Sequence, residues 1–115
     1  MKHRVLFCCG INQNFMNATA EEAKQVWEAT REMLQGIDGL PGLTILGIMD
    51  DDRIQVGPSI SAPWTFYIMA DVQDYESIVE ACNFFRTTPV GDGTYKLWKY
   101  CRVEARIGRE LVVPE

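Results

Sequence analysis

"RVLFCCG", residues 4–10, is the stretch that decides the fold, because its five central positions are all apolar and never alternate with polar ones. A short apolar run that ends at a glycine and asparagines is typical of a buried strand. Two later stretches share the pattern, "LTILGIM" at 43–49 and "WTFYIMADV" at 64–72. Because successive side chains of a strand point to opposite faces, these stretches predict a sheet that is apolar on both faces.

The segments between these strands carry helix signals. Thr19 and Glu22 form a T-x-x-E capping box at the start of the first helix, and Gly36 and Gly39 are expected to end it. Asp74 is the predicted N-cap of a second helix, which ends before Pro89. Apolar residues recur at three- and four-residue spacing in both segments. The positions expected to face the core are Ala23, Val26, Trp27, Thr30, Met33, Leu34 and Ile37, and then Tyr75, Ile78, Val79, Cys82 and Phe85.

The last predicted strand spans residues 94–108, and its interspersed charges favour an edge position. Residues 11–17 and 50–63 are expected to be loops, with a short strand extension at 53–57. The order strand, helix, strand, strand, helix, strand predicts an α+β, ferredoxin-like domain over residues 1–115. Right-handed crossovers then place both helices on one face of a four-stranded antiparallel sheet, with the first and third strands in the centre.

Charge and composition exclude several classes of protein. The chain has 115 residues, 47% of them hydrophobic, and a net charge of −5 with scattered Lys and Arg, so nucleic acid is not an expected partner. The longest uncharged run, 54–70, contains two prolines and is too polar to cross a membrane. Residues 1–20 imitate a signal peptide poorly, because 4–10 are needed as a strand, and the expected location is cytoplasmic.

A second copy of the chain is the expected partner. Two helices cover one face of the predicted sheet, while about ten apolar side chains would remain on the other. Leaving them in water would forgo on the order of 15 kcal/mol, which is as much as the whole stability of a domain. The simplest cover is the same sheet related by a two-fold axis, so the sequence predicts a homodimer with its sheets packed face to face.

Element order and polarity over residues 4–106 resemble the dimeric α/β-barrel superfamily, which includes small cofactor-independent monooxygenases of antibiotic biosynthesis and muconolactone isomerase. "RVLFCCGINQNF", "MDDDR", "PWTFYIMADV" and "TTPVGDGTYKLWKYCRVEARIG" also resemble the small B proteins encoded in bacterial indole-3-acetic acid degradation clusters. This resemblance implies a role in the breakdown of indole-type aromatic acids. It supplies no catalytic motif that can be carried over by residue.

Common metal, cofactor and nucleophile motifs are not found. The carboxylates Asp50–Asp52 follow a strand, where alternating side chains do not converge on one ion, so no metal site is expected. "VGDGTYK" at 90–96 leads into a strand instead of a helix, which favours a turn over a phosphate loop. His3 is the sole histidine, and no cofactor is expected. Four cysteines without metal-ligand spacing, including the adjacent Cys8 and Cys9, are interpreted as reduced thiols.

An aromatic-lined pocket between the helices and the sheet is the remaining hypothesis, with a small aromatic acid as its ligand. Core packing is the alternative role of each aromatic residue, although Phe84 falls off its helix stripe and is expected to touch a partner or a ligand. The reaction stays open between a cofactor-independent monooxygenase, an isomerase and a hydratase; a non-catalytic accessory protein and a purely structural dimer are the alternatives. The candidate ligand-binding residues are Asn12, Asn14, Trp64, Tyr67, Phe84, Arg86, Trp98 and Tyr100, with Trp27, Lys96 and Arg102 as further choices.

Overall fold

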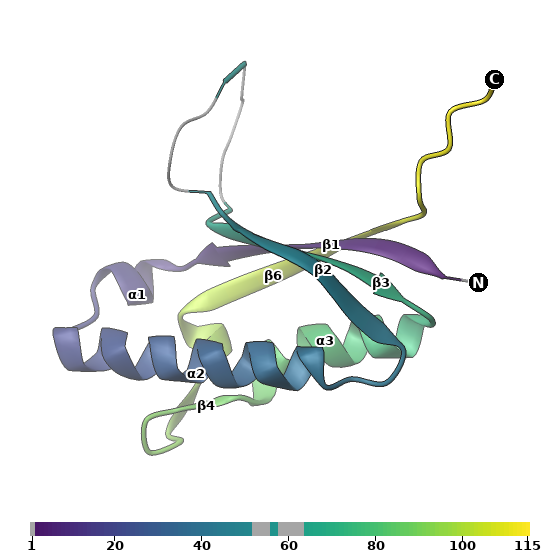
Figure 1. The fold of residues 1–115 in the computed structure, drawn as a ribbon. Coiled ribbons are helices and arrows are strands. Elements are labelled where there is room, and N and C mark those ends of the chain that lie inside the picture. Colours follow the sequence, from purple (N-terminus) through teal and green to yellow (C-terminus); the bar gives the residue numbers. More distant parts are fainter. Residues whose placement is uncertain (1, 52–55, 58–63) are drawn as a thin grey trace.

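The structure is a computed structural model that describes residues 2–51, 56–57 and 64–115 (Figure 1). The predicted extension at 53–57 therefore lies largely outside the described residues. Among the described residues, no helix has the length and apolar character needed to cross a membrane. The elements are β1 (His3–Ile11), α1 (Gln13–Met16), α2 (Ala20–Asp38), β2 (Leu43–Asp50), β3 (Phe66–Val72), α3 (Tyr75–Thr87), β4 (Pro89–Val90), β5 (Tyr95–Lys96), the 3₁₀ helix η1 (Leu97–Lys99) and β6 (Cys101–Gly108).

The described residues form a four-stranded antiparallel sheet in the order β2-β3-β1-β6. This confirms the predicted antiparallel sheet, its central first and third strands and its last strand at one edge. Helices α2 and α3 lie on the same face of the sheet (Figure 1), as expected for an α+β, ferredoxin-like arrangement. We call this the helix face and the opposite one the outer face.

Side chains on the helix face form the core. Phe7, Cys9, Ile68 and Met33 are almost fully buried there, and Ala81 of α3 packs among them. The predicted helix stripes are only partly right, because Trp27, Tyr75 and Val79 are exposed while Ala29 and Ala81 are buried. The space between helices and sheet, where a ligand pocket was expected, is therefore largely filled by packed side chains.

Both predicted helix caps are confirmed. The Thr19 side chain accepts a hydrogen bond from the backbone N–H of Glu22, and the Asp74 carboxylate accepts one from the N–H of Ser77 at 2.8 Å. Each bond satisfies an amide that a helix start leaves without an intrahelical partner. Of the two glycines expected to end this helix, Gly39 is confirmed as its C-cap, whereas Gly36 lies inside α2, which continues to Asp38.

Gly36 has a packing role inside α2. A Cβ atom at this position would lie 2.7 Å from Cε1 and 2.9 Å from Cζ of Phe84 in α3. The missing side chain thus lets the two helices approach, and Phe84 packs against the core of its own chain. Phe84 was expected to touch a partner or a ligand. Its large side chain instead packs within its own chain, between α3 and α2.

We expect Gly36→Ala to destabilise the protein by about 1 kcal/mol. Overpacking against Phe84 costs about 1–3 kcal/mol, and the better helix propensity of alanine offsets roughly 1 kcal/mol of it. Urea denaturation measures the difference. In the double variant Gly36→Ala with Phe84→Leu the clash is gone, so its loss of stability should be smaller than the sum of the losses of the two single variants. A loss equal to that sum would contradict the contact.

The predicted loop at 11–17 and strand at 94–108 are both wrong in part. Residues 13–16 form α1, and residues 94–108 are divided into β5, η1 and β6. The break arises because Leu97 and Tyr100 both turn into the core, where they are 0% and 2% exposed. Side chains of the α1 segment stabilise the turn: the Asn12 amide donates to the backbone oxygens of Trp98 and Lys99, and Asn14 Nδ2 donates to the Lys99 oxygen at 2.9 Å.

Candidate functional site on the outer face of the sheet

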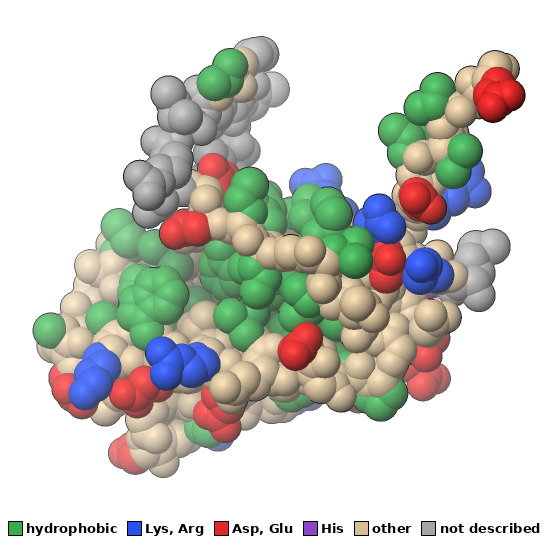
Figure 2. All heavy atoms as spheres, in the orientation of Figure 1, with side chains coloured by type: hydrophobic (Ala, Val, Ile, Leu, Met, Phe, Trp, Pro, Cys, Tyr) green, Lys and Arg blue, Asp and Glu red, His purple; other side chains and the backbone are tan. Residues whose placement is uncertain are grey.

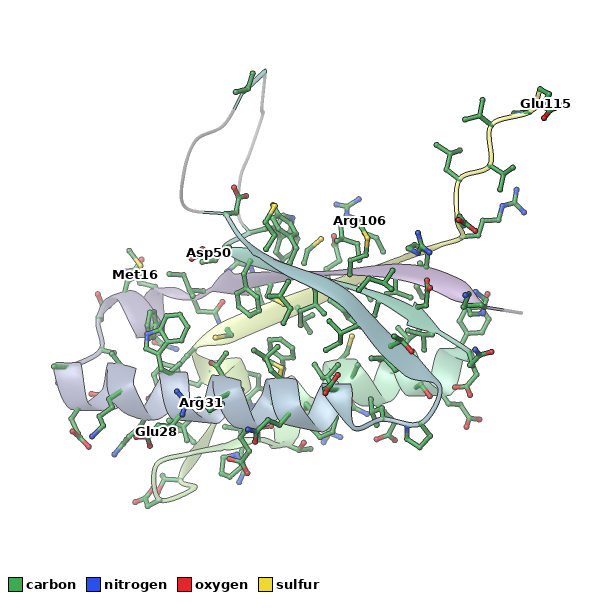
Figure 3. The ribbon with its side chains drawn as sticks, viewed as in Figure 1. Met16, Glu28, Arg31, Asp50, Arg106 and Glu115 are labelled. Atoms are coloured by element: carbon green, nitrogen blue, oxygen red, sulfur yellow. The ribbon has the colours of Figure 1, made fainter. Side chains whose placement is uncertain are left out.

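The outer face is apolar over β1, β2 and β3, as the non-alternating strands predicted. Leu6, Tyr67 and Met69 lie on this face of the central strands, because their neighbours Phe7, Ile68 and Ala70 are buried on the helix face. Charged residues on the same face lie towards its margins. Arg4 of β1 and Asp71 of β3, which are paired near the ends of their strands, form an ion pair at 2.7 Å. On β6, Arg106 is paired with Leu6 and forms an ion pair with Glu104 at 3.1 Å. Figure 3 shows Arg106 on the side of the sheet away from the helices.

A hollow of about 400 Å³ lies on this face, which is within the range of small-molecule sites. Gly47 deepens it, since a Cβ atom at this position would meet no atom within 4 Å. A β-bulge between Ile45 and Gly47 shifts the register of β2 at the same place. We call this site the outer hollow; its lining residues are Leu6, Gly47, Ile48, Met49, Tyr67 and Met69.

One polar pair stands beside this apolar lining. The Tyr67 hydroxyl donates a hydrogen bond of 2.9 Å to Oδ2 of Asp51. The backbone holds both residues in place, because Tyr67 pairs with Met49 in the sheet and the Asp51 N–H donates to the Thr65 oxygen at 2.9 Å. The pair can therefore present a hydroxyl and a carboxylate to a ligand in the outer hollow.

Electrostatics keep the Tyr67 hydroxyl protonated. The hydrogen bond to Asp51 is the main cause that raises the pKa of Tyr67, and burial and the Asp51 charge add to it. Arg106 lies close enough for its positive charge to oppose this rise. The outer hollow thus combines an apolar floor with a neutral hydroxyl, a carboxylate and a nearby guanidinium.

A second concavity lies on the helix side of the β2 edge. This groove, of about 750 Å³, runs between α2 and β2, with Trp27, Leu34, Ile45 and Ile48 among its apolar lining and Arg31 at its rim. Figure 2 shows hydrophobic side chains gathered over β2 and over the space between β2 and α2. Ile48 lines both concavities, so the β2 edge is apolar on its two sides.

Of the predicted ligand-binding residues, Tyr67 is the one that lines the outer hollow. Asn12 and Asn14 hold the turn at η1, and Arg102 Nη1 donates to Asn12 Oδ1 at 3.0 Å. The buried Tyr100 donates from its hydroxyl to Glu22 at 3.3 Å. The remaining predicted ligand-binding residues are also dispersed over the chain. Phe84 packs against Gly36, and Trp64 lies under the Arg102 guanidinium. Trp98 is exposed on η1, and Arg86 is exposed in the last turn of α3.

The thiols and carboxylates offer no alternative centre within the described residues. Burial raises the pKa of Cys9 and raises that of Cys101 to about 11, so these thiols stay protonated and are poor nucleophiles at neutral pH. No group of three or more histidine, cysteine, aspartate or glutamate residues in the described ranges is placed to hold a metal. Asp52, the last of the three consecutive carboxylates, lies outside those ranges, and Asp51 instead bonds Tyr67.

Asp51, Met49, Met69 and Arg106 were missed by sequence reasoning. These residues come together on the outer face because of how the strands are paired, β1 with β3 and β6, and β2 with β3. Sequence alone does not give this register. The two methionines carried no signal beyond hydrophobicity. The useful signal was Asp51 itself, a carboxylate two residues beyond the strand predicted at 43–49.

Comparison with known proteins finds a likeness among solved structures. No protein-family model matches the chain, and no curated protein matches it either. Among solved structures, the chain is similar to a dimeric ferredoxin-like protein of unknown function from Thermobifida fusca. The TM-score is 0.41 and the sequence identity 16%, over 92% of this chain and 90% of that one.

Proposed function

We propose that the protein is a homodimer, of the dimeric α/β-barrel kind, that binds a small aromatic acid of the indole-3-acetic acid type between its two sheets. The observation that carries this proposal is the outer hollow with the Tyr67–Asp51 pair beside its apolar lining. A second sheet over the outer face would close the hollow and exclude water from it. The sequence resemblance to the small B proteins of indole-3-acetic acid degradation clusters implies a ligand of this class.

The polar groups suit the parts of such a ligand. A flat ring fits among Leu6, Met49 and Met69, whose thioethers make favourable contacts with aromatic rings. The carboxylate of Asp51 accepts a hydrogen bond from a ring N–H or O–H group. The guanidinium of Arg106 attracts the carboxylate of the ligand, replacing its exposed ion pair with Glu104.

We expect Tyr67→Phe to weaken binding of indole-3-acetate about tenfold. The variant removes the hydrogen bond by which Tyr67 positions the Asp51 carboxylate for the ligand, and such a bond is worth roughly 1.4 kcal/mol. Titration calorimetry with the unaltered dimer and the variant measures this change. Tyr75→Phe is the matched control, since Tyr75 is exposed at the start of α3, on the helix face, and should leave the affinity unchanged. Equal affinities of the unaltered protein and of Tyr67→Phe would contradict the proposed role of the pair.

A second variant tests the hollow itself. Gly47→Val adds a side chain into open space at a strand position, so it should fill the outer hollow without unfolding the sheet. We expect it to abolish measurable binding while circular dichroism stays unchanged. Undiminished binding would place the ligand elsewhere.

Product analysis separates the two functions that stay open. Incubation with indole-3-acetate or its hydroxylated derivatives, followed by mass spectrometry, should yield a new product if the protein is a cofactor-independent monooxygenase, isomerase or hydratase. Saturable binding with the ligand recovered unaltered would instead assign the protein a non-catalytic, accessory role in the same catabolism.

A further inference from the structure

The C-terminal tail, residues 109–115, carries three apolar side chains that are exposed in the part of the chain that the structure describes. Leu111 is 85% exposed, and Val112 and Val113 are each 75% exposed. The sheet pairing of β6 ends at Gly108, which pairs with Arg4, and the tail then rises from the sheet on the outer face (Figure 1). Figure 3 shows Glu115 far from the body of the chain. Three consecutive exposed aliphatic residues are typical of a segment that binds another surface.

The edge strand β2 has the complementary property. Among the described residues β2 has a sheet partner on one side, β3, and its outward edge is a template for a further strand. Its apolar side chains lie on both faces, with Ile48 in the groove beside α2 and Met49 in the outer hollow. A strand with Leu111 and Val113 on one face and Val112 on the other would cover both sides of this edge.

From these observations we infer that the tail of each protomer adds as a fifth strand to the β2 edge of its partner. The inference rests on the homodimer proposed above. A two-fold axis parallel to the strands exchanges the two edges of the sheet, so it brings β6 and its tail opposite the partner's β2. The tail of the same chain would instead have to cross three strand spacings, about 14 Å, to reach its own β2.

Length and charge agree with this arrangement. Packed sheets lie about 10 Å apart, which takes roughly three extended residues, so the tail reaches the partner's edge with residues 111–114. Pro114 lacks an N–H and suits the end of the added strand. The same axis places Arg102 opposite the acidic end of the partner's β2, because Val103, Cys9, Phe66 and Asp50 lie at one level of the sheet.

Disulfide trapping between two different chains tests the inference. Full-length Val112→Cys and Leu46→Cys variants are mixed, allowed to exchange subunits and oxidised mildly. We expect a covalent dimer that contains one chain of each kind. The same experiment with Val112→Cys and Thr94→Cys, on the distant β4–β5 turn, should give no product above that of the unaltered chain, whose native thiols set the background.

Sedimentation of Val112→Asp gives the second readout. The variant should raise the dimer dissociation constant at least tenfold, whereas Val79→Asp on the helix layer should not change it. A dimer unaffected by Val112→Asp, together with no mixed covalent product, would overturn the strand addition and leave the homodimer standing. A disulfide formed within one chain of the Val112→Cys, Leu46→Cys double variant would also overturn it. An unaltered protein that sediments as a monomer would overturn both proposals.

Discussion

Met69→Lys should convert the protein from a dimer into a monomer. Met69 lies on the outer face of the central strand β3 and is 41% exposed in the single chain. In a face-to-face dimer the two-fold axis brings two such lysines into one apolar interface, where an unpaired buried charge costs about 3 kcal/mol or more. The dimer dissociation constant should therefore rise at least 100-fold, since 1.4 kcal/mol corresponds to a factor of ten.

Val79→Lys provides the matched control for this effect. Val79 is 57% exposed on α3, so it is at least as accessible as Met69 but lies on the helix layer. Size-exclusion chromatography with light scattering should report a monomer for Met69→Lys and a dimer for Val79→Lys. Dissociation by both variants, or by neither, would mean that the outer face is not the interface.

Phe7→Ala should have the largest effect on folding. Phe7 is 1% exposed at the centre of β1, between β3 and β6, and packs in the core beneath α2 and α3. Truncation of such a ring leaves a cavity and costs about 3–5 kcal/mol, a large share of the 5–15 kcal/mol that stabilises a typical domain.

Phe15→Ala is the comparison for this prediction. Phe15 is a half-buried residue of α1 at the margin of the core, so its loss should cost about 1 kcal/mol. Urea denaturation at one fixed protein concentration gives both values. Similar losses for the two variants would show that the core is not centred on β1.

The strands and caps could be predicted because their signals are local. The apolar runs at 4–10, 43–49 and 64–72 fall on β1, β2 and β3, and the short capping patterns at Thr19 and Asp74 hold in the structure. Each depends on residues a few positions apart. The sheet order followed from these elements through the general rules of chain crossover.

The errors arose where distant residues decide the local conformation. Gly36 was interpreted as a helix stop, but its neighbour in space is Phe84, on another helix. The strand predicted at 94–108 is interrupted at η1, where Leu97 and Tyr100 turn into the core and where Asn12 and Asn14 bind carbonyl groups from 85 to 87 residues away. The same holds for the candidate site. Tyr67 could be selected from its residue type, but its hydrogen bond to Asp51 depends on the register of β2 with β3, which sequence did not give.

Sedimentation equilibrium of the unaltered protein tests the central claim most directly, because everything proposed for the outer hollow depends on a second sheet covering it. At low micromolar concentration we predict a single species with twice the 13.1 kDa mass of the chain. A species of 13.1 kDa under the same conditions would contradict the account, since the apolar outer face would then be stable in water without a partner.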